Sequence, residues 1–97
     1  MASYIILGKY TEQGIRNIKE SPQRTDLVRG AFEAAGGKLP AFYLTIGQYD
    51  FVAVAEAPDD ETFTRVLLGI VSSGNVMTET LKALPEADYR RIVSSLT

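Results

Sequence analysis

The stretch FYLTIGQYDFVAVAE, residues 42–56, decides the fold of this chain of 97 residues. Apolar residues alternate with their neighbours on both sides of Gly47-Gln48, and such alternation over short runs is typical of β-strands. A two-residue loop that begins with glycine suits a type II′ turn. We therefore expect a β-hairpin in which residues 38–46 form one strand and residues 49–56 form the next.

The segment 3–10, near the N-terminus, is rich in Tyr and Ile and predicts another strand. Its alternate residues place Tyr4 and Ile6 on one face and Ile5 and Leu7 on the other, so both faces are apolar. Gly8 interrupts the run, which indicates a β-bulge or a close approach of neighbouring atoms. We expect this strand to need cover on both sides.

Helix signals lie between this strand and the hairpin. Thr11 can cap a short helical turn within residues 11–20. Ser21-Pro22 is a stronger start signal, with Ser21 as the cap and proline at the first helical position. Gly36-Gly37 indicates the end of that helix. The segment between the first two strands is therefore expected to be mainly helical.

A second helix is predicted after the hairpin. Asp59 can cap it, and its apolar residues follow helical spacing from Phe63 onward, while Leu68 lies off that stripe as an ordinary exposed leucine or a subunit contact. Residues 76–84 fit a fourth strand, and Pro85 begins a last helix. The order of elements is thus βαββαβ followed by a helix.

This order predicts an α+β, ferredoxin-like fold, with a four-stranded antiparallel sheet and both long helices on one face. We expect one domain over residues 1–97. The face without helices carries too many apolar residues to stay in water. Either the C-terminal helix folds across it or a second copy covers it, and we predict a homodimer through this face that could assemble into a larger oligomer.

The composition excludes several classes of function. The chain has no His and no Cys, which removes the usual catalytic triads, thiolate chemistry and the usual zinc sites. A net charge of -2 argues against nucleic-acid binding. The N-terminus does not resemble a signal peptide, and no apolar run is long enough to cross a bilayer. We expect a cytoplasmic protein without a metal, a cofactor or a membrane partner.

Three blocks of sequence resemble the GYD domain family: residues 8–19 (GKYTEQGIRNIK), residues 47–50 (GQYD) and residues 75–80 (NVMTET). The resemblance extends over roughly residues 4–90 and implies a fold of the dimeric α/β-barrel type, without an established activity. Other dimeric α/β barrels include cofactor-free monooxygenases, lactone isomerases, haem-degrading enzymes and ligand-sensing domains. The lack of histidine disfavours haem degradation.

Candidate ligand-binding residues come from two places in the chain. One is a polar group around the first helical turn, which could bind a carboxylate or another small anion, or could be an ordinary solvated helix surface. The other is the hairpin and its strands, where an Asp and several Tyr could line a cavity, or could instead fix the turn and pack in the core or in a dimer interface. The candidates are Lys9, Gln13, Arg16, Asn17, Tyr43 and Asp50, with Tyr4, Tyr10 and Tyr49 beside them.

These features support three hypotheses about function. The first is a homo-oligomeric domain that binds a small molecule without catalysis. The second is a cofactor-independent isomerase or monooxygenase-like enzyme acting on a small aromatic or lactone-like compound, and the third is a purely structural oligomer. A polar pocket that joins Lys9 or Arg16 to Tyr43 and Asp50 would favour the first two, and a lining of apolar side chains alone would weaken the enzyme hypothesis.

Overall fold

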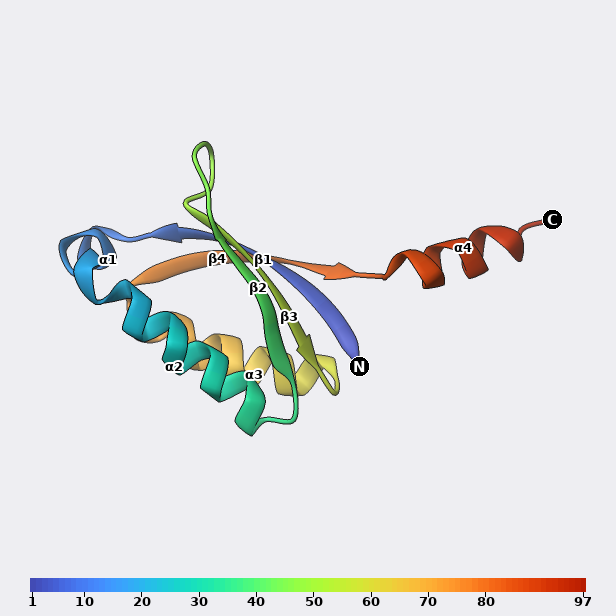
Figure 1. The fold of residues 1–97 in the computed structure, drawn as a ribbon, viewed down its shortest axis with the longest axis horizontal. Coiled ribbons are helices and arrows are strands. Elements are labelled where there is room, and N and C mark those ends of the chain that lie inside the picture. Colours follow the sequence, from blue (N-terminus) through green and yellow to red (C-terminus); the bar gives the residue numbers. More distant parts are fainter.

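The computed structural model describes residues 1–97 and has the predicted ferredoxin-like α+β fold (Figure 1). The four strands form an antiparallel sheet in the order β2-β3-β1-β4. In chain order, the elements are β1 (Ala2–Tyr10), α1 (Glu12–Arg16), the 3-10 turn η1 (Ile18–Glu20), α2 (Ser21–Ala34), β2 (Lys38–Leu44), β3 (Phe51–Ala57), α3 (Asp60–Val71), β4 (Val76–Ala83) and α4 (Glu86–Ser94).

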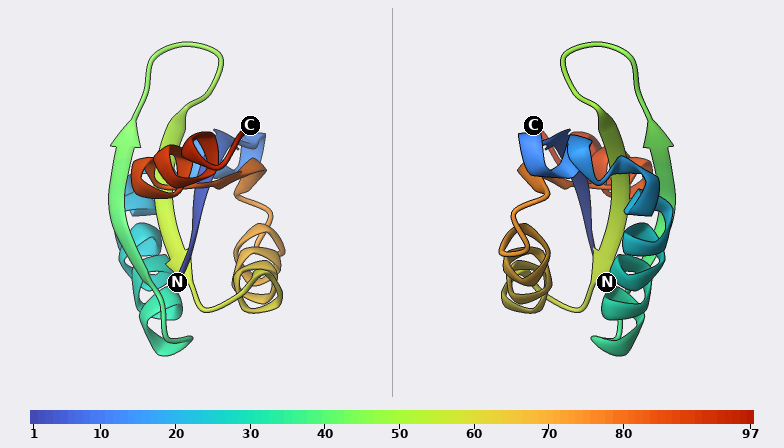
Figure 2. Two further views of the ribbon diagram at one scale, coloured as in Figure 1. Left: turned by 90° about the vertical axis from the view of Figure 1, so that its right-hand side faces the viewer. Right: turned by 90° about the vertical axis from the view of Figure 1, so that its left-hand side faces the viewer.

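Helices α2 and α3 lie side by side on one face of the sheet and leave the other face bare (Figures 1 and 2). The core lies between these helices and the sheet, where the ring of Tyr4 stacks on Phe63 with centroids 3.9 Å apart, and Phe32 lies 5.9 Å from Phe63. The alanines of β3 face the same layer. Small side chains on the sheet thus leave room for large rings from the helices.

Capping explains where two of the helices begin. The Asp59 carboxylate accepts a hydrogen bond from the backbone N–H of Thr62 at 2.8 Å, and the Thr11 hydroxyl accepts one from the N–H of Gly14, as the sequence predicts. The predicted Ser21 cap is wrong. Because η1 runs directly into α2, Ser21 is already helical, and Glu20 precedes it without a side-chain capping bond.

The predicted two-residue turn in the hairpin is also wrong. Strand β2 ends at Leu44 and β3 begins at Phe51, so a longer loop joins them. Asp50 explains the difference because it is tied to β1: its N–H donates to the Gly8 carbonyl at 2.8 Å, and its carboxylate accepts from the Tyr10 N–H at 2.9 Å. The hairpin rises from the sheet on the side without helices (Figure 1).

Gly8 permits the Phe51 ring to lie close to the backbone, and it does not form a β-bulge. It pairs in regular register with Phe51 of β3 and Thr78 of β4. A Cβ atom added at Gly8 would lie 2.0 Å from Cζ of the Phe51 ring. The aromatic ring therefore covers the position that any other side chain would need.

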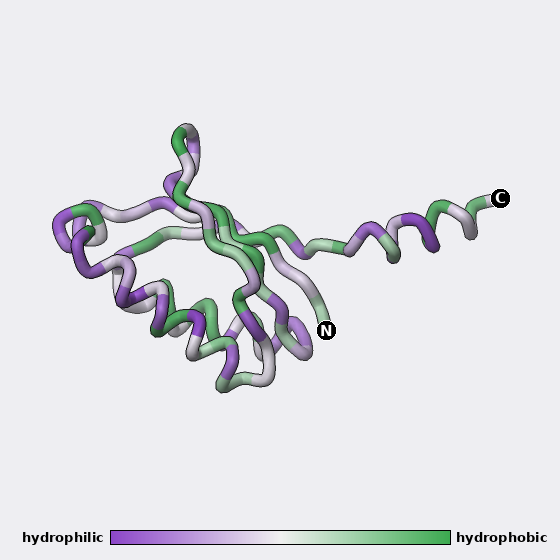
Figure 3. The backbone as a smooth tube through the Cα atoms, viewed as in Figure 1, coloured by the Kyte–Doolittle hydropathy of each residue, from purple (hydrophilic) through white to green (hydrophobic).

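The bare face of the sheet is apolar, as expected. Two rows of cross-strand neighbours run over it, Ala41–Val54–Ile5–Leu81 and Tyr43–Val52–Leu7–Glu79. We call this surface the open face. Hydrophobic residues are concentrated in the strands, as Figure 3 shows.

Helix α4 does not fold across the open face. The segment 84–97, called here the C-terminal arm, projects away from the sheet (Figure 1) and leaves Leu84, Tyr89 and Leu96 exposed. The radius of gyration of 14.7 Å exceeds the roughly 12.5 Å expected for a compact chain of this length. The chain thus carries two apolar surfaces without a partner. None of its helices has the length and apolar character needed to cross a membrane.

Candidate ligand-binding cavity

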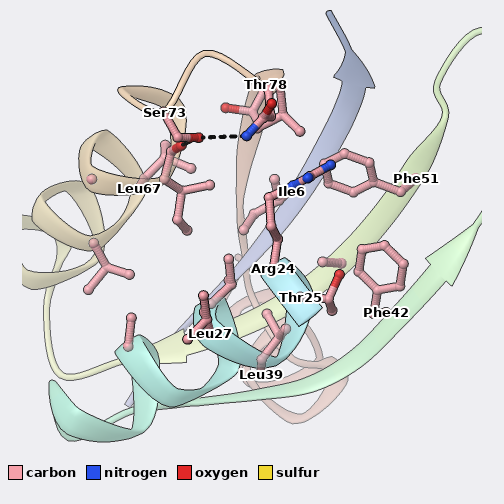
Figure 4. A pocket seen from close by; sticks show the side chains of 18 of the residues that line it. Ile6, Arg24, Thr25, Leu27, Leu39, Phe42, Phe51, Leu67, Ser73 and Thr78 are labelled. Atoms are coloured by element: carbon pink, nitrogen blue, oxygen red, sulfur yellow. Dashed lines mark hydrogen bonds between the residues drawn. The ribbon is translucent and has the colours of Figure 1, made fainter. Parts of the chain in front are cut away.

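A cavity of about 450 Å³ lies between α2, α3 and the helix-covered face of the sheet (Figure 4). Helix α2 contributes Val28, helix α3 contributes Ile70, and the sheet contributes aromatic and aliphatic side chains. Most of the lining is hydrophobic, and its members include Ile6, Val28, Leu39, Phe42, Phe51 and Ile70. Its size lies in the range of small-molecule sites, which are about 300–1,000 Å³.

Arg24 is the polar group that stands out in this lining. Its Nη1 donates to the backbone carbonyl of Asn17 at 3.1 Å and lies 3.7 Å from the Glu20 carboxylate. Its Nη2 is buried and has no hydrogen-bond partner. In Figure 4 the Arg24 side chain extends from α2 toward Phe51. Arg24 therefore lines a mostly apolar space while one of its guanidinium nitrogens, enclosed by neighbouring atoms, has no acceptor.

The other polar side chains of the cavity are neutral or already paired. The Tyr10 hydroxyl lies 3.3 Å from the Ser21 hydroxyl, and the Thr25 hydroxyl donates to the Ser21 carbonyl at 3.1 Å. Arg65 binds the Glu61 carboxylate at 3.0 Å and is mainly exposed. No Asp, Glu or Lys belongs to the lining. Arg24 and Arg65 are therefore the only charged side chains of the lining.

Tyr10, one of the tyrosines that the sequence suggested for a cavity, lines this one, whereas none of the six main candidate residues does. Gln13 donates to the Ser73 carbonyl and the Asn75 side chain, both at 3.0 Å, and so ties α1 to the loop before β4. Arg16 pairs with Glu12 in solvent, at 2.9 Å. Asn17 contributes its carbonyl to Arg24. The polar group around α1 therefore connects secondary-structure elements, and its part in ligand binding remains a prediction.

The remaining candidates lie at the hairpin and on the open face. The carboxylate of Asp50 is engaged by β1, and Tyr43 is exposed on the open face. Lys9 lies 5.6 Å from the centroid of the Tyr49 ring, and the Tyr49 hydroxyl donates to Glu79 at 3.1 Å. This hydrogen bond, with a smaller contribution from desolvation, raises the pKa of Tyr49. The predicted polar pocket is not part of the cavity.

A family model for the GYD domain matches residues 4–93. The chain belongs to the GYD domain family. A protein of Thermus thermophilus, named glutamine synthetase and cystathionine beta-lyase binding protein, is 38% identical to this GYD protein over 89 residues. The match covers 91% of this chain and 94% of that protein.

Solved structures support the fold of this GYD protein. The feast or famine regulatory protein of M. tuberculosis, solved with L-methionine, has a TM-score of 0.67 at 14% identity, over 88% of this chain and 51% of that chain. The structure of TTHA0845 from Thermus thermophilus has a TM-score of 0.55 at 25% identity, over 88% and 95% of the two chains. The leucine response regulatory protein of Mycobacterium tuberculosis has a TM-score of 0.57 at 15% identity, over 87% and 51%.

Sequence reasoning missed Arg24, the most informative residue of the GYD protein's cavity. A signal for it exists in the sequence. Arg24 precedes Val28 by four residues and Ala31 by seven, so it continues the apolar stripe of α2 toward the start of the helix. A charged residue within an inward-facing stripe would have indicated a buried polar contact.

A second polar cluster of the GYD protein lies outside the cavity and joins α3 to the sheet. The Tyr4 hydroxyl donates to the Asp60 carboxylate at 2.5 Å, and Lys82 binds the same carboxylate at 2.9 Å. The hydrogen bonds from Tyr4 and Lys82 lower the pKa of Asp60. Burial, and then Asp60, raises the pKa of Tyr4 to about 12. Asp59 and Asp60 thus serve the start of α3, and no group of His, Cys, Asp or Glu that could hold a metal ion is found.

Proposed function

We propose that this protein is a non-catalytic binding protein that works as a homo-oligomer and takes a small molecule into the cavity beneath α2 and α3. The observation that carries this proposal is the cavity itself. It combines about 450 Å³ of mostly apolar space with a buried, unpaired Arg24 nitrogen. Small-molecule sites have this character, a hydrophobic wall with a few polar groups that orient the ligand.

The lining argues against catalysis. Acid–base chemistry depends on side chains that can gain or lose a proton, and a Ser or Thr nucleophile needs such a base beside it. The titratable groups of the lining are the phenol of Tyr10 and the guanidinium groups of Arg24 and Arg65, so its Ser and Thr hydroxyls have no base of the usual kind to activate them. The hydroxyl of Tyr10 is next to Ser21 and has no general base beside it. The enzyme hypothesis is therefore less well supported than simple binding.

The open face and the C-terminal arm support self-association. Four strands spaced about 4.8 Å apart, with about seven residues each, give an open face of roughly 440 Å² in projection. A stable interface buries about 800 Å² on each partner. A face-to-face pair of sheets would thus benefit from the exposed Tyr89, Ile92 and Leu96 of the arm. In a dimer with twofold symmetry, the open face and the arm of each copy could be buried against the other copy.

A second candidate function rests on the Thermus thermophilus relative. That protein is named for binding glutamine synthetase and cystathionine beta-lyase, and the two chains match over nearly their full lengths. By this hypothesis, the protein attaches to a metabolic enzyme in the cytoplasm, and the exposed arm provides the contact. Ligand binding and enzyme attachment are compatible because the cavity and the arm are separate parts of the molecule, whereas self-association through the arm would compete with enzyme attachment.

Native mass spectrometry of the purified full chain tests the proposal. We expect a dimer or larger oligomer with extra mass from a bound small molecule. The variant Val28→Phe, which fills part of the cavity, should lose that mass but keep the subunit count. A variant that ends at Ala83 should keep the ligand and form weaker oligomers. A monomeric full chain contradicts the self-association, and an empty cavity that binds no added small molecule contradicts the binding function.

A further inference from the structure

We infer that the ligand of the cavity is an amphipathic monocarboxylate, with its carboxylate on Arg24 and its apolar body beneath α2 and α3. This inference rests on the proposed function and narrows it to one chemical class. It follows from three properties of the lining: the unpaired donor, the balance of charge and the hydrophobic wall.

The unpaired donor defines where the head group binds. Within the guanidinium of Arg24, Nη1 has the Asn17 carbonyl as an acceptor, whereas Nη2 is buried and has none. The Glu20 carboxylate lies 3.7 Å from Nη1, which is beyond normal hydrogen-bond distance, and it is largely exposed to solvent. A buried donor without an acceptor is costly, and arginine matches the planar geometry of a carboxylate. Nη2 itself has almost no accessible surface, although the Arg24 side chain as a whole is 24% exposed, so a carboxylate in the cavity would satisfy Nη2 once the guanidinium turns toward it.

The charge balance limits the head group to a single negative charge. Arg65 is mainly exposed and binds Glu61 at 3.0 Å, whereas Arg24 lies 3.7 Å from Glu20 and keeps a buried nitrogen without an acceptor. A phosphate dianion would retain an unbalanced charge among apolar side chains, which is unfavourable. A monocarboxylate matches the charge of Arg24.

The same balance argues against a free amino acid. The ammonium group of an amino acid needs a carboxylate or several carbonyl acceptors, and the lining contains no Asp or Glu. Burying an ammonium group without such partners is costly. The ligand is therefore a simple acid without a charged amino group.

The hydrophobic wall defines the rest of the ligand. Phe42, Phe51 and Leu39 from the sheet face Val28 and Ile70 from the helices. The volume of about 450 Å³ corresponds to about fifteen water molecules, at roughly 30 Å³ each in the liquid. This space is large enough for a medium-chain aliphatic acid or a small aryl-alkanoic acid.

Isothermal titration calorimetry with matched probes tests this class. The acids are octanoate and 3-phenylpropionate, the neutral partners are 1-octanol and 3-phenylpropanol, and phenylalanine serves as the zwitterion. We expect both acids to bind at least 10-fold more tightly than their alcohols and phenylalanine to bind more weakly than 3-phenylpropionate. Equal affinity for acid and alcohol would overturn the carboxylate inference but leave the binding function intact. Failure of every probe to bind, with no ligand co-purified, would overturn both.

Variants of the arginine assign the contact. Arg24→Gln should weaken acid binding by about 10- to 100-fold, as expected for a charged hydrogen bond, and leave alcohol binding unchanged. Arg29→Gln is the matched control, because Arg29 lies on the same helix, pairs with Asp26 and does not line the cavity. Equal affinities of these two variants for the acids would overturn the role of Arg24.

A gain of affinity provides a test that misfolding cannot imitate. Glu20 competes weakly for the guanidinium of Arg24 at 3.7 Å. Glu20→Gln removes that competing charge and should strengthen acid binding by about two- to fivefold, without an effect on the alcohols. Unchanged or weaker acid binding would overturn the electrostatic basis of the inference.

Discussion

The two faces of the sheet differ in cover far more than in composition. On the helix-covered face, one cross-strand row places Phe42, Ala53 and Ile6 beneath α2 and α3. On the open face, the next row places Val54, Ile5 and Leu81 toward solvent. Both rows are apolar, and successive residues of the same strands supply them. The comparison teaches that hydrophobic residues specify a surface to be buried but do not specify what buries it.

The covered face is also the face with room inside it. Its lining includes the small residues Ala31, Ala53 and Gly69, which leave space where larger side chains would fill the layer. The open face has no enclosed volume because nothing lies opposite it. We therefore propose ligand binding for the covered face and assembly for the open face, and the variants below test that proposal.

The largest expected effect is on the stability of the protein, when the core beneath the covered face is changed. Phe32 of α2 is 0% exposed, and Phe32→Ala should lower the free energy of unfolding by about 3–5 kcal/mol because it leaves a cavity in the core. Leu27→Ala, on the same helix but at a residue that is 73% exposed, should change it by about 0.5 kcal/mol or less. Urea denaturation measures both, and similar losses would contradict the assignment of the core.

The next effect concerns assembly through the open face. Leu81→Glu introduces a charge into the apolar row and should raise the dissociation constant of the oligomer about 100-fold, or about 2.8 kcal/mol, with little change in monomer stability. Leu68→Glu is the control, because Leu68 on α3 has a similar exposure, 59% against 52%. Analytical ultracentrifugation measures both constants. A larger effect of Leu68→Glu would move the interface to the helices.

A smaller effect is expected at the close contact of Gly8 with Phe51. Gly8→Ala forces the ring of Phe51 to move, because the new Cβ would lie 2.0 Å from it, and should destabilise the protein by about 1–3 kcal/mol. Since Phe51 lines the cavity, ligand affinity should also fall. Gly30→Ala in α2, where nothing lies within 4 Å, should instead stabilise the protein by about 0.5–1 kcal/mol. A neutral Gly8→Ala would show that the ring moves freely.

The smallest expected effect is on the pH dependence of the Tyr4–Asp60 contact. The pKa of Tyr4 is raised to about 12, mainly by burial, from about 10 in an unfolded chain. Its contribution to stability is therefore complete below pH 10 and is lost as the pH rises toward 12. Tyr4→Phe should lack this alkaline loss, which urea denaturation across that pH range measures.

Tyr4→Phe should also change how the stability of the protein falls at acid pH. Because the pKa of Asp60 is lowered, first by Tyr4 and then by Lys82, this carboxylate contributes stability above its ordinary pKa and loses it as the pH falls further. Tyr4→Phe should make the acid loss shallower. Identical profiles for the two proteins at both extremes would contradict a role of this contact.

Much of the fold could be predicted from local patterns. The Tyr- and Ile-rich run of β1, the strand pattern of β3, the Asp59 cap and the helical stripe from Phe63 each depend on residues close in sequence, and the structure confirms them. The hairpin turn could not be predicted because a contact distant in sequence decided it, and the start of α2 was misjudged because the residues just before it are themselves helical. Asp50 is tied to β1, across 40 residues of chain, and η1 extends α2 beyond its apparent cap.

The candidate site was less predictable. The sequence left the dense polar group that includes Gln13 and Arg16 open between a binding site and a solvated surface, and in the structure these side chains bind the loop before β4 and a neighbouring glutamate. The cavity instead depends on Arg24, whose meaning appears only when α2 packs against the sheet. A polar side chain acquires a function from its neighbours, and most of those neighbours are distant in sequence.

By itself, the sequence determined the order of strands and helices, the ferredoxin-like topology and the existence of two apolar sheet faces. These features follow from short-range periodicity, caps and chain connectivity. Only the tertiary structure decided that α4 leaves the open face bare and that a cavity with an unpaired guanidinium nitrogen lies beneath the helices. The physical reason is that volume and hydrogen-bond satisfaction are properties of packed layers, which no single segment contains.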